Sequence, residues 1–432
     1  MNTFAIVGLS ALGLIVLVFA LIGVLYLTRG TPIERVVAWG DPDGPPAVSE
    51  EQFCPMMALH AKAPLLPGHS ITIAINGDQT YDRLWADLRS ARVSITLQMY
   101  YFLPGRMANE LKAILLERAR AGVRVLLLHD AFGSQELPEE YVDEMVAGGV
   151  AVAAFRPVRW YQLHKTQHRS HIRVVVVDGR LAWTGGFGID DKWYGDGRHE
   201  NQWRDTNVRF EGPCVVQHQA TFAAGWAEAT GELLTGDLFF PGEATEPKGT
   251  VVAGCMHAAP TIGSTAAERY LALSIAAAER TLYITNSYFV PDDSFCDLLG
   301  QAADRGVDVR ILTAGRETDV KTTWRAGRAR YEALLARGVK IYEYRPTMVH
   351  AKTLVADGTW VAIGTLNFDN RSLAFNDESV LLAYDDAIGG DMEQIFREDL
   401  PFSDEILLEE FRRRGTWERV LEQMATSISR IL

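Results

Sequence analysis

The pattern of apolar and polar positions divides the chain into an apolar N-terminal stretch and a long alternating remainder. Residues 4–27 contain no charged side chain and consist mainly of Leu, Ile, Val, Phe, Ala and Gly. At a rise of about 1.5 Å per residue, a helix of this length can cross a hydrocarbon core of about 30 Å. A cleaved signal peptide would have a shorter apolar region and a small-residue cleavage site, which does not follow here. We therefore expect residues 1–29 to form a single-pass transmembrane anchor in the cell membrane.

Charged and turn-forming residues after this stretch indicate how the chain continues. Arg29 and Arg35 follow the apolar residues, whereas residues 1–3 offer only the terminal amine as a positive charge. The positive-inside rule therefore favours a cytoplasmic position for the body of the protein. Residues 30–69 contain an Asp-Pro-Asp-Gly-Pro-Pro run and further prolines, which is typical of a linker.

The rest of the chain alternates short apolar runs, typical of buried strands, with amphipathic stretches of about 10 to 15 residues, typical of helices. This alternation occurs twice: ARVSITLQMYYFLP at residues 91–104 matches AERTLYITNSYFVP at residues 278–291, and the segments that follow match in the same order. The repeat predicts one ancestral α/β unit used twice, with the two halves packed about a pseudo-twofold axis. The expected boundaries are 70–245 for the first half, 246–265 for a connection and 266–432 for the second half.

Both halves carry the same chemical motif at the same place. The first half has His171, Arg173 and Asp178 in the spacing H-x-R-x4-D, and the second has His350, Lys352 and Asp357 in the spacing H-x-K-x4-D. One such match could arise by chance among ten histidines, but two matches in corresponding strands of a duplicated unit make coincidence very improbable. Residues two apart on a strand share a face, so each histidine and its base project into one pocket. Each aspartate falls on the opposite face near the strand end, which suits a turn-stabilising role.

Two facing histidines with basic neighbours suit phosphoryl chemistry. One neutral imidazole can attack phosphorus while a protonated one gives its proton to the leaving oxygen, and the bases hold the non-bridging oxygens. This reading needs no cofactor. A metal site is not expected, because no H-E-x-x-H sequence or carboxylate-rich cluster occurs. The G-x-S-x-G and P-loop motifs are also absent, and the four cysteines lie far apart without a C-x-x-C pair.

These motifs resemble those of the phospholipase D superfamily, and within it the bacterial cardiolipin synthase branch. The resemblance extends from about residue 70 to the C-terminus. It implies two phospholipase D-like α/β halves with one active site at their interface and a ping-pong reaction through a phosphohistidine. The most specific stretches are VVVVDGRLAWTGGFGIDDKW (174–193), WRDTNVRFEGP (203–213), GVKIYEYRP (338–346) and HAKTLVADGTWVAIGTLNFDNRSLAFNDE (350–378).

The resemblance also implies roles for individual residues. His171 resembles the nucleophile, and His350 the general acid that later acts as the base. Arg173 and Lys352 would bind the phosphate together with Asn367. Asp205 and Glu378 match the carboxylates that orient the two imidazoles, which is a way of fixing the tautomer and basicity of a histidine.

The first half departs from the family pattern at two positions. Arg173 stands where the family has lysine, and Gly188 where many members have an asparagine that corresponds to Asn367. Arginine keeps its charge and can bind phosphate bidentately, but its planar fork needs more room than an ammonium group. The site could therefore be active, altered in substrate, or inactive. We favour an active enzyme, because both histidines and all four candidate acidic partners are present.

The leading functional hypothesis is a membrane-anchored phosphatidyltransferase. It would make cardiolipin from phosphatidylglycerol, with phosphatidylglycerol or another phospholipid as the second substrate. The anchor would keep the site beside its lipid substrate, and aromatic and basic residues in 157–171 suit contact with anionic headgroups. A hydrolytic phospholipase D, a phosphodiesterase or nuclease, and a non-catalytic lipid-binding scaffold remain alternatives. The net charge of −13 argues against nucleic acid as a partner, and no feature indicates an obligate protein partner.

Overall fold

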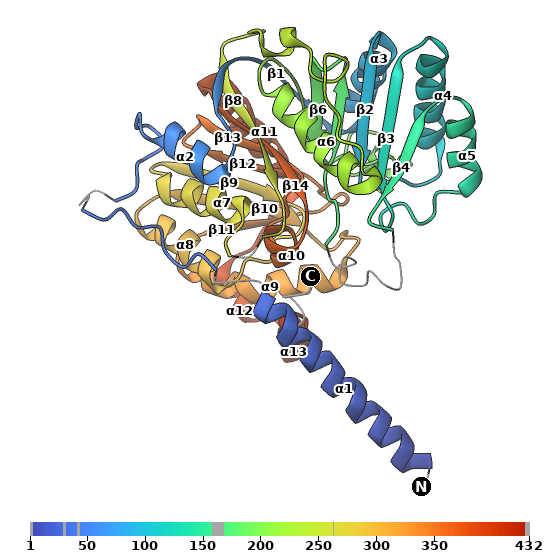
Figure 1. Cartoon of the computed structure of the whole chain (residues 1–432). Helices are drawn as coiled ribbons and strands as arrows, with labels where there is room; N and C mark the ends of the chain where they lie inside the picture. Colours follow the sequence, from blue (N-terminus) through green and yellow to red (C-terminus); the bar gives the residue numbers. More distant parts are fainter. Residues whose placement is uncertain (1–2, 29–31, 41–43, 158–167, 262, 428–432) are drawn as a thin grey trace.

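The computed structural model of the chain describes residues 3–28, 32–40, 44–157, 168–261 and 263–427. Its body contains one 15-stranded mixed sheet flanked by helices (Figure 1). Two helices precede this body in the sequence: α1 (Thr3–Thr28) and α2 (Phe53–Ala61).

The first half of the sheet and its helices are formed by residues up to 245. These elements are β1 (Leu66–Ile75), α3 (Asn76–Ser90), β2 (Ser94–Met99), α4 (Arg106–Arg120), β3 (Arg124–Asp130), α5 (Glu139–Ala147), β4 (Ala151–Phe155), β5 (Val174–Val177), β6 (Leu181–Gly185), η2 (Asp191–Trp193), β7 (Thr206–Glu211), α6 (Val215–Thr230) and η3 (Gly242–Thr245).

The second half repeats this order of elements and adds three short ones at its end. Its elements are β8 (Val251–Ala258), α7 (Ala266–Ala277), β9 (Thr281–Asn286), α8 (Asp293–Asp304), β10 (Asp308–Ala314), α9 (Lys321–Ala336), β11 (Lys340–Tyr344), β12 (Lys352–Ala356), β13 (Trp360–Gly364), α10 (Asn370–Ala374), β14 (Glu378–Tyr384), α11 (Asp386–Asp399), η4 (Leu400–Phe402), β15 (Ser403–Glu405), α12 (Leu408–Arg412) and α13 (Thr416–Thr426).

The strand order is the same in both halves when read outward from the centre of the sheet. It is β1-β7-β6-β5-β2-β3-β4 in one direction and β8-β14-β13-β12-β9-β10-β11 in the other, with β15 added at the second edge. The central strands β1 and β8 pair antiparallel. This arrangement is what a twofold axis between β1 and β8 requires, and it confirms the α/β fold with two duplicated halves.

Two segments outside the expected halves carry regular structure. β8 lies within residues 246–265, for which the sequence indicates a connection, and it takes the place in the second half that β1 takes in the first. Residues 30–69, expected as a linker, contain α2 and the beginning of β1. The apolar face of α2 is buried through Phe53 and Met57, so this helix packs against the second half.

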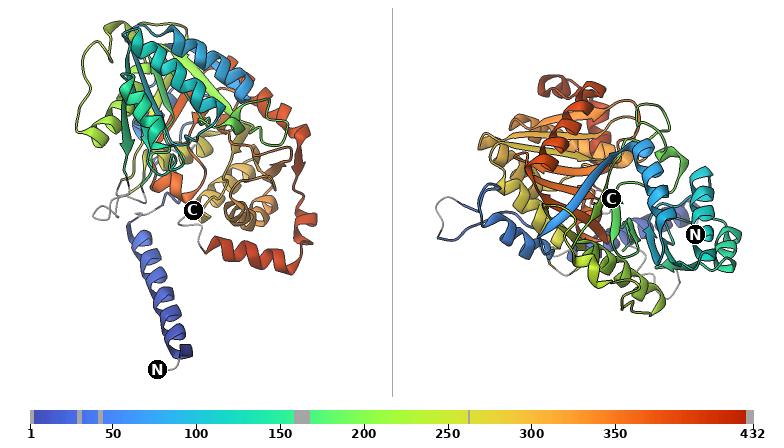
Figure 2. Two further views of the ribbon diagram at one scale, coloured as in Figure 1. Left: turned by 90° about the vertical axis from the view of Figure 1, so that its right-hand side faces the viewer. Right: turned by 90° about the horizontal axis from the view of Figure 1, so that it is seen from above.

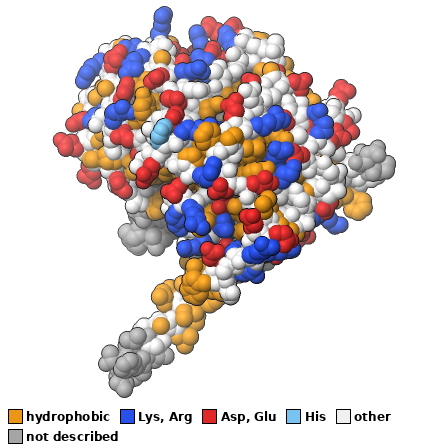
Figure 3. Space-filling model, turned by 180° about the vertical axis from the view of Figure 1, so that it is seen from behind, with side chains coloured by type: hydrophobic (Ala, Val, Ile, Leu, Met, Phe, Trp, Pro, Cys, Tyr) orange, Lys and Arg blue, Asp and Glu red, His pale blue; other side chains and the backbone are white. Residues whose placement is uncertain are grey.

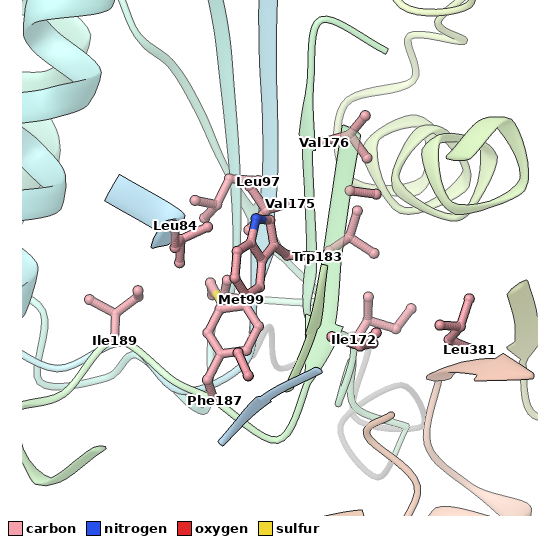
Figure 4. Packing of buried hydrophobic residues seen from close by; sticks show 14 of the residues in the cluster. Leu84, Leu97, Met99, Ile172, Val175, Val176, Trp183, Phe187, Ile189 and Leu381 are labelled. Carbon is pink, nitrogen blue, oxygen red and sulfur yellow. The ribbon is translucent and has the colours of Figure 1, made fainter. Parts of the chain in front are cut away.

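The core holds the strands that lead to the candidate site. All four residues of β5 are buried, and β5 lies between β2 and β6. Figure 4 shows Val175 beside Leu97 and Trp183 in this cluster, with Ile172 on the side toward Leu381 of β14. Because Ile172 immediately follows His171, burial of its side chain fixes the backbone at that histidine.

Helix α1 extends away from the body as an isolated helix (Figures 1 and 2). Among the residues that the structure describes, no helix meets the length and hydropathy expected of a membrane span. The transmembrane anchor over residues 1–29 is therefore not confirmed.

Candidate active site

The two motif histidines lie where the halves meet, and each is held by the backbone of the opposite half. The backbone N–H of His171 donates to the carbonyl oxygen of Asp377 (2.9 Å), and that of His350 donates to the carbonyl oxygen of Arg204 (2.6 Å). Short parallel bridges reinforce both contacts at the preceding residues. The crossing is reciprocal, as the pseudo-twofold arrangement requires.

The residues that follow these two carbonyls are the candidate orienting carboxylates. His171 Nδ1 lies 3.0 Å from both carboxylate oxygens of Glu378. His350 Nδ1 donates to the carbonyl oxygen of Gly186 (2.9 Å) and lies 3.4 Å from Asp205 Oδ2. In both imidazoles Nδ1 is therefore engaged by the protein, which leaves Nε2 available for a ligand.

The two bases are buried beside the histidines. Arg173 is 1% exposed and donates from Nη1 to the carbonyl oxygen of His171 (2.7 Å). Lys352 is 4% exposed and donates from Nζ to the carbonyl oxygen of His350 (2.6 Å). In both halves, the base thus donates a hydrogen bond to the backbone of the histidine two residues before it, which holds the two residues of each motif together.

Burial and charge shift the protonation equilibria of the whole group. Desolvation, together with the positive charges of Arg173 and Lys352, holds the pKa values of both His171 and His350 well below the ordinary value. Burial raises the pKa of Glu378 to about 8. Since both histidines respond to both bases, the four side chains form one electrostatic site drawn from both halves.

The two motif aspartates are engaged away from this group, in turns. Oxygens of Asp178 accept the backbone N–H groups of Arg92 (3.0 Å), Val93 (2.8 Å) and Ser94 (2.9 Å). Asp357 accepts the corresponding three N–H groups, those of residues 279–281, at 2.7 to 2.9 Å. These contacts join the end of β5 to the start of β2, and the end of β12 to the start of β9.

The remaining expected residue, Asn367, follows β13 and is 4% exposed. Its Oδ1 is buried without a hydrogen-bond partner among the described residues. It lines a small cavity together with Lys352. Because leaving a buried acceptor unpaired is costly, Oδ1 is available for a hydrogen bond from a donor, and the N–H group of the same amide can donate to a ligand.

Several residues outside the two motifs contact the site, among them Trp193 and Trp203, which the sequence allows either as a wall of the entrance or as packing residues. Trp193 and Trp203 pack on the His350 ring, with centroid distances of 5.1 Å for each, and Trp193 Nε1 donates to Asp205 Oδ2 (2.8 Å). Thr365 donates to Glu378 Oε2 (2.5 Å). A buried tryptophan with an N–H partner leaves no distinctive sequence pattern, so the sequence does not show that these rings lie against His350.

Two further expectations concern metals and the segment before His171. Within the described ranges, no group of three or more His, Cys, Asp or Glu side chains is arranged to hold a metal ion. Of the aromatic and basic segment 157–171, residues 158–167 lie outside the described residues.

Comparison with known proteins places the chain. Residues 84–226 and 271–400, more than half of the chain, match the family described as "Cardiolipin synthase, PLD-like domain". The chain is 34% identical over 363 residues to "Cardiolipin synthase" of Geobacillus kaustophilus, covering 83% of this chain and 72% of that protein. It is 32% identical over 373 residues to "Cardiolipin synthase A" of Pseudomonas entomophila, covering 86% of this chain and 77% of that protein.

A solved structure shares the fold at much lower sequence identity. Phosphatidylserine synthase of Haemophilus influenzae superimposes with a TM-score of 0.64 at 12% identity, covering 85% of this chain and 97% of that one. At this identity the likeness concerns the fold alone. The sequence matches go further: the chain belongs to the cardiolipin synthase family of the phospholipase D superfamily, and it is a phospholipase D-type phosphatidyltransferase.

Proposed function

We propose that the protein is a membrane-anchored enzyme that makes cardiolipin from phosphatidylglycerol, with phosphatidylglycerol or another phospholipid as the second substrate. The reaction runs through a covalent phosphohistidine and uses no metal ion. The observation that carries this proposal is the reciprocal pairing of the site. His171 contacts Glu378 of the other half, His350 contacts Asp205 of the other half, and a buried base stands beside each histidine.

In the first step, Nε2 of neutral His171 attacks the phosphorus of the donor lipid. When Glu378 is ionised it accepts the Nδ1 hydrogen bond, so the lone pair of the imidazole resides on Nε2. The bond between phosphorus and the headgroup oxygen breaks, and that oxygen takes a proton from His350. When phosphatidylglycerol is the donor, glycerol leaves and a phosphatidyl group remains on His171.

In the second step, His350 works in the opposite direction. A hydroxyl group of the acceptor lipid gives its proton to the now neutral His350, and its oxygen attacks the phosphorus. The bond between phosphorus and His171 breaks, which frees the enzyme and releases cardiolipin. In the second step His350 regains the proton that it gave in the first, so the two steps balance without any other proton donor.

The charges of the site support this assignment. Arg173 and Lys352 hold the non-bridging oxygens, where negative charge concentrates in the transition state. In the free enzyme these two cations lower the pKa of His350. A bound phosphodiester offsets their charge and raises that pKa, so His350 becomes a proton donor when substrate is present. The amide N–H group of Asn367, which is a hydrogen-bond donor, adds a contact to the phosphate.

The expected location supports a lipid substrate. Large apolar side chains of α1 face solvent: Leu14, Leu17 and Phe19 are 62%, 66% and 69% exposed, and Figure 3 shows apolar side chains along the described part of this helix. Exposed apolar surface of this extent favours burial in a bilayer. Anchoring the body on the cytoplasmic side of the cell membrane would raise the local concentration of the lipid at the site.

The test is a lipid assay with purified full-length protein in vesicles that contain phosphatidylglycerol, with and without phosphatidylethanolamine. Cardiolipin and phosphatidic acid are quantified by mass spectrometry, and His171→Ala serves as the control. We expect cardiolipin from the wild-type protein and none from the variant.

Other outcomes would identify a different function. Phosphatidic acid without cardiolipin would mean that water is the acceptor and that the protein is a hydrolase. A lack of any lipid product, together with hydrolysis of DNA or of a simple phosphodiester, would indicate a nuclease or phosphodiesterase. No turnover of any of these would indicate a non-catalytic lipid-binding scaffold.

A further inference from the structure

The two halves differ at a coordinated set of positions around their bases. Corresponding positions follow from the sequence repeat and from the strands that both halves share. The first half has Met99, Tyr100, Arg173 and Gly188 where the second half has Asn286, Ser287, Lys352 and Asn367.

In the second half, the polar contacts around Lys352 are made by several side chains. Lys352 Nζ donates to Ser287 Oγ (2.5 Å) as well as to its own histidine. Asn286 Nδ2 donates to the carbonyl oxygen of Leu366 (3.2 Å). Asn367 follows directly and keeps Oδ1 unpartnered within the described part of the chain. An ammonium group and an amide therefore border this side of the site.

In the first half, the guanidinium group of Arg173 makes the corresponding contacts. Phe187 occupies the position of Leu366. The side chain of Met99, at the position of Asn286, has no N–H group that could donate to the carbonyl oxygen of Phe187. Arg173 Nε donates to that oxygen instead (3.1 Å). Its Nη1 donates to the carbonyl oxygen of His171 (2.7 Å), and the guanidinium carbon lies 5.8 Å from the centre of the Tyr100 ring. Two of the five N–H groups of arginine are thus used, and no other described group accepts from this side chain.

The first half also lacks room for the amide of the second. A Cβ atom at Gly188 would lie 3.0 Å from the Trp193 ring and 3.1 Å from Tyr101 Cβ. Trp193 is 1% exposed and held by its bond to Asp205, so it has little freedom to move aside. An asparagine here would displace a ring that also packs on His350.

We propose that Arg173 alone makes the phosphate contacts that Lys352 and Asn367 share in the second half, so that the two phosphate clamps are chemically unequal. This rests on the proposed function, because it assigns the remaining N–H groups of Arg173 to the substrate phosphate. The guanidinium presents these groups as a planar fork that fits two phosphate oxygens, which an ammonium group does not. Arginine at this position is a working alternative to lysine rather than a damaged residue.

A binding experiment tests this proposal without requiring turnover. Orthovanadate is titrated into full-length wild-type, Arg173→Lys and Asn367→Gly proteins in detergent, by calorimetry, and the melting temperature of each protein is measured in parallel. We expect Arg173→Lys to weaken vanadate binding about 30-fold or more, since both bidentate contacts are lost. Asn367→Gly should weaken it less, about 3- to 10-fold, because Lys352 remains. An Arg173→Lys protein that binds vanadate as tightly as the wild type, with only a lower melting temperature, would make Arg173 a structural residue and would overturn the proposal.

The second half offers a mirror test by activity. Lys352→Arg should reduce cardiolipin formation strongly, because the larger guanidinium meets the amide of Asn367. If the two substitutions acted independently, their fold-losses of activity would multiply. The double variant Lys352→Arg/Asn367→Gly should be at least about 10-fold more active than that product predicts, because it copies the arrangement of the first half. Multiplicative losses would contradict the proposal. A wild-type protein that forms no lipid product but binds vanadate through Arg173 would contradict the proposed function and leave the unequal clamps intact.

Discussion

At the scale of single residues, Glu378 is the side chain whose surroundings give the clearest measurable consequence. It is fully buried against His171, and burial raises its pKa to about 8. A group that binds its proton more tightly in the folded state contributes stability that is complete below its unfolded pKa. That contribution is lost as pH rises through the folded pKa.

This gives a prediction for Glu378→Gln, a variant that cannot titrate. Between pH 5 and pH 9 the wild-type protein loses the contribution of Glu378, whereas the variant does not. The free energy of unfolding of the variant relative to the wild type should therefore rise with pH, by a few kcal/mol over this range. Urea denaturation at the two pH values measures it. A difference between variant and wild type that stays constant with pH would mean that Glu378 keeps an ordinary pKa.

Only some of the contacts made by single residues can be predicted from the sequence. The spacing around His171 and His350 indicates the candidate residues, but the structure places both histidines and Arg173 just before β5 and β12 and not within these strands. The spacing does not predict that Glu378 serves the histidine of the opposite half. That pairing depends on how two segments some two hundred residues apart cross, and so does the packing of Trp193 on His350.

At the scale of elements, the two motif aspartates stabilise the turns that join the strands of the site. Asp178 and Asp357 both have a positive φ, of 53° and 55°, and each is followed by a glycine with positive φ. Each carboxylate accepts three backbone N–H groups at the start of a neighbouring strand. The sequence predicts this role, since the aspartate lies on the strand face opposite the base.

Replacing either aspartate should therefore affect stability more than chemistry. We expect Asp178→Ala or Asp357→Ala to lower the free energy of unfolding by about 2 to 4 kcal/mol, because several N–H groups lose a charged acceptor. The turnover number of the folded protein at low temperature should change by less than about threefold. Denaturant titration measures the change in stability, and a cardiolipin assay at low temperature measures the change in turnover. A loss of turnover as large as that of His171→Ala would place the aspartates in the chemistry.

Elements were predictable where the apolar pattern was regular. The apolar run at residues 174–177 forms β5 (Val174–Val177), and the apolar run at residues 353–356 falls within β12 (Lys352–Ala356). β8 carries Gly254, and it follows a turn-rich segment, so its sequence VVAGCMHA gave no alternation to read. Its role became visible only from its pairing with β1 and β14.

At the scale of the whole molecule, the site exists only because two halves of one chain meet. Each histidine takes its backbone acceptor and its carboxylate from the opposite half. Neither half contains a complete pair. The candidate site therefore depends on both halves, and under the proposed mechanism a lesion in either half should inactivate the enzyme.

Mixing two inactive variants tests whether a single chain builds the site. His171→Ala and His350→Ala should each lower cardiolipin formation by at least about 1000-fold. An equimolar mixture of the two, unfolded and refolded together, should be no more active than either alone. Recovery of a substantial fraction of wild-type activity would show that halves from different chains assemble the site.

The proposed anchor acts at the same scale, through the position of the body relative to the lipid. Removing residues 1–29 leaves every contact of the site in place. We therefore expect the shortened protein to make cardiolipin from phosphatidylglycerol in detergent micelles at a rate within about threefold of the full chain. In vesicles its rate should fall by about 10-fold or more, because the lipid is no longer held at a high effective concentration. If the rate of the shortened protein relative to the full chain were the same in micelles and in vesicles, the body would reach the bilayer without α1, and the apolar helix would serve another purpose.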